Sequence, residues 1–197
     1  MLVAPVGQCC IPHRPESVSR LLQYYQRNPD TWDLLSGPLV LDSLAGVHTH
    51  FADKWRDGMW GTWDTDARGL SVHNPPFEIP AQGLGLFSCR RDAWLGFNPH
   101  FREFGGEEWY IHEKYRQAGA KCLCLPFLRW QHRFADPAAG RTYSRSVEGK
   151  IRNYILGHQE LGLSLDRLRR HYVDGLNEDP QSPINADGRL PAEQFAA

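Results

Sequence analysis

The spacing of apolar residues along the chain changes between two periods, and each period predicts one kind of element. A stripe with apolar residues at i, i+3, i+4 and i+7 predicts an amphipathic helix over residues 16–28; its members are Val18, Leu21, Leu22 and Tyr25. Further helices are predicted at 107–118, 147–156 and 164–173. Short apolar runs predict buried strands at 37–42, at the end of 77–90 and at 121–126. This order of elements indicates a mixed α/β fold.

Breaks in the pattern divide the chain into three parts. Residues 1–15 contain three Pro residues and Gly7, so we expect an irregular N-terminal segment there. Residues 16–173 are expected to form one domain, which suits a chain of 197 residues. Residues 174–197 are rich in Asn, Asp, Pro, Gln and Gly, and we expect a disordered tail. Within the domain, residues 46–76 have little periodicity and many Trp and His residues. We expect an irregular stretch that lines a site, or alternatively a loop packed on its own tryptophans.

The composition excludes some classes of partner. The chain has 22 basic against 23 acidic residues, so no charge excess points to nucleic acid. No apolar run approaches the roughly 18 residues of a membrane span, and the N-terminus lacks the features of a signal peptide. Cys122 and Cys124 alternate on one face of a predicted strand, and no pair among the five Cys has zinc or redox spacing. We therefore expect reduced, buried thiols and a cytoplasmic location.

The strongest candidate for chemistry is a pair of acids at the start of a predicted helix. Gly105 and Gly106 precede Glu107 and Glu108. A carboxylate there could act as a general base or orient a hydroxyl, and the two glycines would let a substrate approach the backbone. A helix of about 12 residues is roughly 18 Å long, and a following strand of similar length would bring His132 back towards the acids. The alternative is a plain turn with first-turn acids that complement the helix dipole.

These elements together resemble a known family. The sequence F-G-G-E-E at 104–108, the helix after it, and W-Q-H-R-F at 130–134 resemble the second half of a GT-A glycosyltransferase of the family 2 type. They are also similar to polypeptide N-acetylgalactosaminyltransferases, which carry a W-G-G-E element followed by a histidine at the same spacing. G-L-F-S at 85–88 is similar to the G-G-L-F strand of those enzymes, with Leu84 in place of the first glycine. The resemblance covers roughly residues 16–134.

The resemblance implies a GT-A fold, in which a mixed sheet is flanked by helices, and it implies sugar transfer from a nucleotide-sugar donor to a carbohydrate or other hydroxyl acceptor. It implies a divalent metal, Mn or Mg, with His132 as a metal ligand. Glu107 would work at the sugar and acceptor, and Glu108 would be a candidate base. Whether transfer inverts or retains the sugar's configuration stays open. The residues implied to bind substrate are Gly105, Gly106, Gln82, Gly83, Gly85, Trp60, Trp63 and Trp109.

One departure from the family concerns the nucleotide site. Family members hold the metal and the diphosphate with a D-x-D or D-x-H motif at the end of an apolar strand, and this chain begins where that motif should stand. We therefore expect a partial GT-A fold that lacks the nucleotide-binding half, which a partner chain could supply. The literal D-x-D at Asp64 and Asp66 follows G-T-W instead of an apolar strand, so these acids are a weaker metal candidate, with ordinary loop acids as the alternative.

Two other classes of function remain open at this point. His48 and His50 have the spacing that places two imidazoles on one strand face, and with His132 and an acid they could form a metal-dependent hydrolase. The chain could also be a non-catalytic remnant of the fold that binds sugar through its tryptophans.

Overall fold

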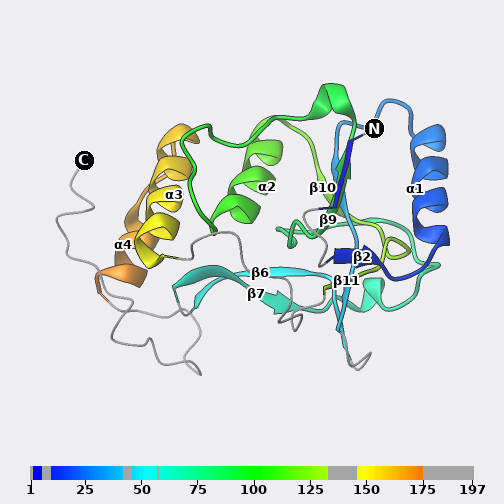
Figure 1. The fold of residues 1–197 in the computed structure, drawn as a ribbon, viewed down its shortest axis with the longest axis horizontal. Coiled ribbons are helices and arrows are strands. Elements are labelled where there is room, and N and C mark those ends of the chain that lie inside the picture. Colours follow the sequence, from blue (N-terminus) through cyan, green and yellow to red (C-terminus); the bar gives the residue numbers. More distant parts are fainter. Residues whose placement is uncertain (1, 6–9, 42–45, 57, 133–145, 175–197) are drawn as a thin grey trace. The chain divides into compact units, whose positions relative to one another are not determined.

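The computed structural model describes residues 2–5, 10–41, 46–56, 58–132 and 146–174, and it confirms a mixed α/β fold (Figure 1). Its α-helices are α1 (Glu16–Arg27), α2 (Glu107–Gln117), α3 (Val147–Glu160) and α4 (Asp166–Tyr172). All four occur where the apolar periodicity predicts helices. Residues 133–134 of the family-like motif and almost all of the expected C-terminal tail lie outside the described residues.

The strands form two mixed sheets and a two-stranded ribbon (Figure 1). The first sheet has the order β1 (Leu2–Pro5), β9 (Leu86–Cys89), β3 (Leu34–Ser36), β10 (Cys122–Cys124) and β8 (Phe77–Glu78). The second has the order β2 (Cys10–Pro12), β11 (Trp130–His132), β4 (Leu39–Val40) and β5 (Val47–His48). β6 (His50–Arg56) pairs with β7 (Met59–Asp64). Only the pairs β3–β10 and β4–β11 are parallel among the pairings of the two described sheets.

Three expectations about the first half of the chain are wrong in part. Residues 1–15 contain strands β1 and β2; both are edge strands, the position in a sheet where proline is tolerated. The run at 37–42 yields only the short strand β4, and β3 ends before Gly37. Residues 46–76 are largely ordered as β5, β6, β7 and a 3-10 turn, η1 (Ala67–Gly69), instead of an irregular stretch. A second 3-10 turn, η2 (Arg91–Ala93), follows β9.

The chain divides into two compact units, which we describe separately. The sheet unit consists of Met1–Ala52, Trp63–Leu95 and Lys114–Gly140, and it contains both mixed sheets and α1. The helical unit consists of Asp53–Thr62, Gly96–Glu113 and Arg141–Ala197. It contains α3, α4 and the first part of α2. The predicted acid pair therefore belongs to the helical unit, and His132 belongs to the sheet unit.

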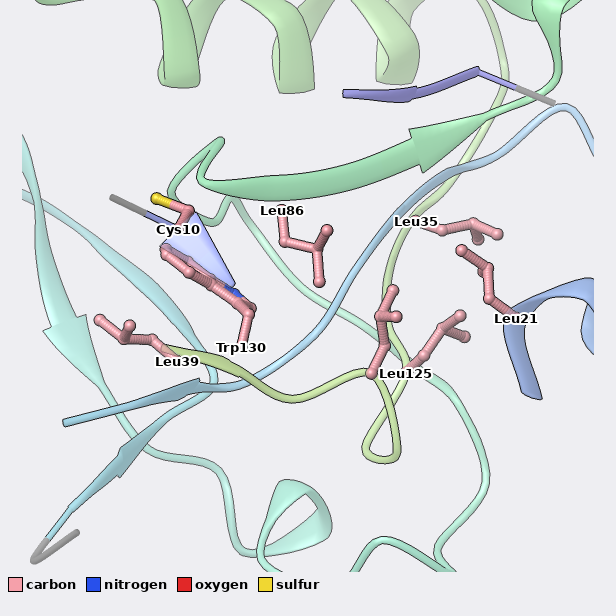
Figure 2. Packing of buried hydrophobic residues seen from close by; sticks show 8 residues of the cluster. Cys10, Leu21, Leu35, Leu39, Leu86, Leu125 and Trp130 are labelled. Atoms are coloured by element: carbon pink, nitrogen blue, oxygen red, sulfur yellow. The ribbon is translucent and has the colours of Figure 1, made fainter. Parts of the chain in front are cut away.

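The core of the sheet unit joins α1 to strands of both sheets (Figure 2). Its buried members are Cys10, Leu21, Leu35, Leu39, Leu86, Leu125, Leu128 and Trp130. The buried face of α1 differs from the predicted stripe, because Val18 and Leu22 are 39% and 45% exposed. Ser17 is buried instead and donates from Oγ to the Phe127 carbonyl, so the helix is rotated to place Ser17 and Leu21 inward.

Four cysteines lie in the described residues, and the structure shows the burial of each thiol. Cys10, Cys89, Cys122 and Cys124 are buried, as expected, and Cys122 and Cys124 share one face of β10. Within the described ranges, the helices are all too short or too polar to cross a membrane.

The core of the helical unit is built from aromatic rings around Trp55. The ring of Trp55 lies 4.8 Å from that of Tyr154 and 5.2 Å from that of His171, measured between centroids. The backbone N–H of Gly58 donates to His171 Nε2, and the Tyr172 hydroxyl donates to the Gly58 carbonyl. The turn between β6 and β7 is thereby fixed to α4.

Candidate functional site

The loop that carries the predicted acid pair is tied to α3 by one buried side chain. Asn153 Nδ2 donates to the carbonyl oxygens of Arg102 and Gly105, at 2.8 and 3.0 Å. Its Oδ1 accepts from the Arg102 N–H at 3.0 Å. Asn153 is 1% exposed, so its carboxamide depends on these three bonds for its hydrogen-bond partners. The position of the acids is therefore set by a residue of α3, which the sequence analysis predicts as a helix without assigning it a role.

Both glycines before the acids are required by the backbone. Gly105 and Gly106 have φ angles of 115° and 91°, which side chains with a Cβ rarely adopt. A Cβ on Gly105 would also lie 2.5 Å from Cγ of Lys150, so the lysine stem crosses directly over this glycine. Gly105 thus allows a close approach, and in this structure the approaching group is a side chain of α3.

Glu107 and Glu108 begin α2 in unlike surroundings, and both are partly buried. Glu107 Oε2 accepts a hydrogen bond from the Gly105 N–H at 2.7 Å. Burial raises the pKa of Glu107, against the opposing effects of this hydrogen bond and of the Lys150 charge. Burial and the neighbouring Glu107 charge raise the pKa of Glu108 to about 8. At neutral pH the pair therefore retains a proton, which ordinary surface glutamates would have lost.

Tyr154 lies next to this pair and was missed in the sequence analysis. Its hydroxyl accepts from the Trp60 N–H at 3.0 Å, and its ring lies 3.4 Å from where a Cβ on Gly106 would be. Burial, with smaller contributions from the charges of Glu108 and Glu107, raises the pKa of Tyr154 well above its ordinary value. The phenol therefore stays neutral and links the acid pair to β7. A tyrosine in a helix gives no sequence signal for such a contact.

Two of the three tryptophans predicted to bind substrate are buried in the helical unit. Trp60 is 5% exposed and donates from Nε1 to Asp53 Oδ1 at 2.7 Å. Trp109 is 8% exposed, and its ring stacks on the imidazole of His158 with centroids 4.1 Å apart. In the structure both rings serve packing.

The predicted substrate residues of the sheet unit are likewise engaged in packing. Gln82 is fully buried, donates from Nε2 to the carbonyls of Gly37 and Thr49, and accepts from the Gly83 N–H. A Cβ on Gly83 would lie 3.0 Å from the Trp63 ring. One on Gly85 would lie 2.2 Å from the ring of Trp130. Trp63 keeps partial exposure and packs against Phe51 and His48.

The predicted metal ligands do not come together within the described residues. No group of three or more His, Cys, Asp or Glu side chains that could hold a metal ion occurs in that part of the chain. Asp66 caps η1 and forms a salt bridge with Arg68, and the hydrogen bonds from Arg68 lower the pKa of Asp66 to about 2. Asp64 Oδ1 accepts from the Thr65 N–H.

The histidines give no better fit to a metal ion. His50 Nδ1 bonds the Thr49 hydroxyl, and the ring of His48 packs on Trp63. The ring of His132 lies 6.3 Å from that of Trp130, measured between centroids. The described residues alone do not fit a metal ion, and we derive no step through one.

The raised pKa of Glu108 predicts that stability falls as the pH rises. Unfolded, Glu108 loses its proton near its ordinary pKa of 4.5, whereas the folded chain holds it up to about 8. Between these values the folded state binds more protons, so the free energy of unfolding should decrease with pH, by about 1–2 kcal/mol for a partly buried group. Urea unfolding from pH 5 to 8.5 measures this slope.

A matched pair of variants isolates the acid pair as the source of that slope. Glu108→Gln should flatten the dependence, because the amide does not titrate. Glu148→Gln, at an exposed position in the first turn of α3, should leave the dependence unchanged. A slope of equal size in the Glu108→Gln variant would contradict the assignment.

We compared the chain with protein families, curated proteins and solved structures, and only the solved structures gave a match. No protein-family model matches the sequence, and no curated protein matches it. Among solved structures, the chain resembles a crystal structure of GalNAc-T7 with UDP, GalNAc and Mn²⁺, at 19% sequence identity and a TM-score of 0.47. The match covers 66% of this chain but only 26% of the other. A likeness at this level does not bear on function.

Proposed function

We propose that the chain is the acceptor-side part of a glycosyltransferase, which moves a sugar from a nucleotide-sugar donor to an acceptor hydroxyl. The observation that carries the proposal is the acid pair at the start of α2, which follows two glycines with positive φ and retains a proton at neutral pH. The F-G-G-E-E and W-Q-H-R-F motifs support the same assignment through the family resemblance.

The proposed reaction needs a group that takes one proton. The acceptor oxygen attacks C1 of the donor sugar, the bond from C1 to the diphosphate oxygen breaks, and the nucleoside diphosphate leaves with that electron pair. The proton of the acceptor hydroxyl passes to a carboxylate of the pair if the configuration is inverted. If the configuration is retained, Glu107 instead positions the sugar. The buried, hydrogen-bonded setting of Glu107 suits a positioning role, and Glu108 is the better proton acceptor.

The nucleotide and metal parts of the proposal come from the resemblance alone. The resemblance implies Mn or Mg at the diphosphate of the donor, with His132 as one ligand. The alternative of a metal-dependent hydrolase has no supporting cluster among the described residues. Sugar binding through Trp60 and Trp109 is disfavoured by their packing against Asp53 and His158.

A donor panel tests the proposal. The chain, in the longest form that its coding region encodes, is incubated with uridine- and guanosine-diphosphate sugars, simple alcohol or sugar acceptors, and Mn²⁺ or Mg²⁺. We expect release of nucleoside diphosphate from at least one donor. If no donor turns over and calorimetry detects no binding of uridine or guanosine diphosphate with Mn²⁺, the chain is a non-catalytic remnant and the proposal fails.

A further inference from the structure

The two glutamates of the pair differ in what stabilises their charged forms. Glu107 accepts the Gly105 N–H and lies in the field of the Lys150 ammonium, and both contacts favour its carboxylate. Glu108 receives one such contact within the described part of the chain, from its own backbone N–H, while the Glu107 charge opposes its ionisation. The members of the pair are therefore not interchangeable, and the difference originates partly on α3.

Lys150 is held where it can act on this difference. It lies in the first turn of α3, one turn before Asn153, which clamps the loop of Gly105. Its Cβ, Cγ and Cδ all lie within 3.3 Å of where a Cβ on Gly105 would be, so the stem crosses the same residue whose N–H binds Glu107. Any side chain at position 105 would displace the lysine. Gly105 therefore has two roles: its positive φ allows the turn, and its lack of a side chain leaves room for the stem of Lys150.

We propose that Lys150 is a positioning residue of the acid pair: it holds Glu107 as the charged member, so that Glu108 carries the exchangeable proton. This role rests on the proposed function for its catalytic meaning, but the assignment of the proton is a property of the chain itself. The resemblance to family motifs ends before α3, and none of those motifs includes Lys150.

The surroundings of the pair within the helical unit agree with this assignment. From α2, the charge of Glu107 acts on Glu108. From α3, the charged group is Lys150 and the titratable group is Tyr154, whose hydroxyl bonds the Trp60 N–H and stays neutral. No second cation among the described residues acts on Glu107 in the same way. Removing the lysine charge should therefore make Glu107 harder to ionise and bring the two carboxyl groups closer in pKa.

Carbon-13 NMR titration of the glutamate carboxyl groups tests the inference in the chain without any substrate. In the wild type, Glu107 should titrate below Glu108, with Glu107→Gln and Glu108→Gln used to assign the signals. Lys150→Met should raise the pKa of Glu107 further, and Lys150→Arg should restore it. Lys54→Met, at an exposed position of β6 in the same unit, is the control for loss of one positive charge.

The possible outcomes separate cleanly. Titration of Glu108 below Glu107 in the wild type overturns the inference, as does a Lys150→Met shift no larger than that of Lys54→Met. Should Lys150→Met fail to fold by circular dichroism, Lys150→Gln keeps part of the stem across Gly105 and is judged by the same criterion. Because the readout needs no donor, a failed donor panel would remove the proposed function and leave this result standing.

Discussion

Replacing Glu108 by Gln is expected to lower the rate of sugar transfer by roughly 10²–10⁴-fold, the usual contribution of a positioned general base. The amide keeps the shape of the carboxyl group but does not accept the proton of the acceptor hydroxyl. Because a base acts when it is deprotonated, the wild-type rate should rise with pH towards the pKa of Glu108, about 8, and then level off. The measurement is initial velocity against pH with the best donor and acceptor of the panel.

The control for this variant is Glu148→Gln, which changes an exposed acid of the same unit and should leave both the rate and its pH dependence unaltered. Glu107→Gln should also lower the rate, because it removes the carboxylate bound by Gly105. A Glu108→Gln variant that keeps the wild-type rate and pH profile would contradict the assignment of Glu108 as the general base. Separate determination of kcat and KM would show whether binding had changed instead.

Replacing Asn153 by Ala should cost about 2–4 kcal/mol of the free energy of unfolding. The truncation removes three hydrogen bonds at once and leaves the part-buried carbonyl of Arg102 and the buried carbonyl of Gly105 without this donor. The carbonyls and the N–H are fixed by the loop, so little relaxation can replace the lost amide. Urea unfolding at pH 6, where the acid pair holds its proton, gives the value directly.

Asn74→Ala is the matched control, because its carboxamide donates a hydrogen bond of 2.9 Å to the Arg68 carbonyl in an exposed turn. Its loss should cost about 0.5 kcal/mol. We also expect Asn153→Ala to shift the titration of Glu107, since the loop that presents the Gly105 N–H is released. A cost below about 1 kcal/mol would mean that α2 alone holds the loop.

Local sequence patterns predict the helices and the start of α2 well, because these features depend on neighbouring residues. The stripe around Leu21 predicts α1, and two glycines before Glu107 predict a turn into α2. The helix still rotates about its axis to bury Ser17, since the Phe127 carbonyl that receives its hydroxyl is distant in sequence. Periodicity therefore locates a helix more reliably than it selects the buried face.

Contacts between distant residues explain what the sequence could not reveal. β3 finds its parallel partner in β10, far along the chain, so its three residues carry no signal of their own strong enough to mark a strand. The composition identifies Trp60 and Trp109 but does not say whether an indole faces a ligand or a neighbour. The support of the acid pair by Asn153 depends on how α3 packs, which no local pattern encodes.

The fully buried amide of Gln82 has a consequence for natural variation at its position. Its Nε2 donates hydrogen bonds to the carbonyls of Gly37 and Thr49, and its Oε1 accepts one from the Gly83 N–H. A neutral amide, which has both donors and an acceptor, therefore fits all three partners. A single-nucleotide change that encodes Glu would direct carboxyl oxygens at carbonyl oxygens in a space without water. Alleles that encode Glu at this codon should therefore be rare among natural sequences of this gene, whatever the function of the protein.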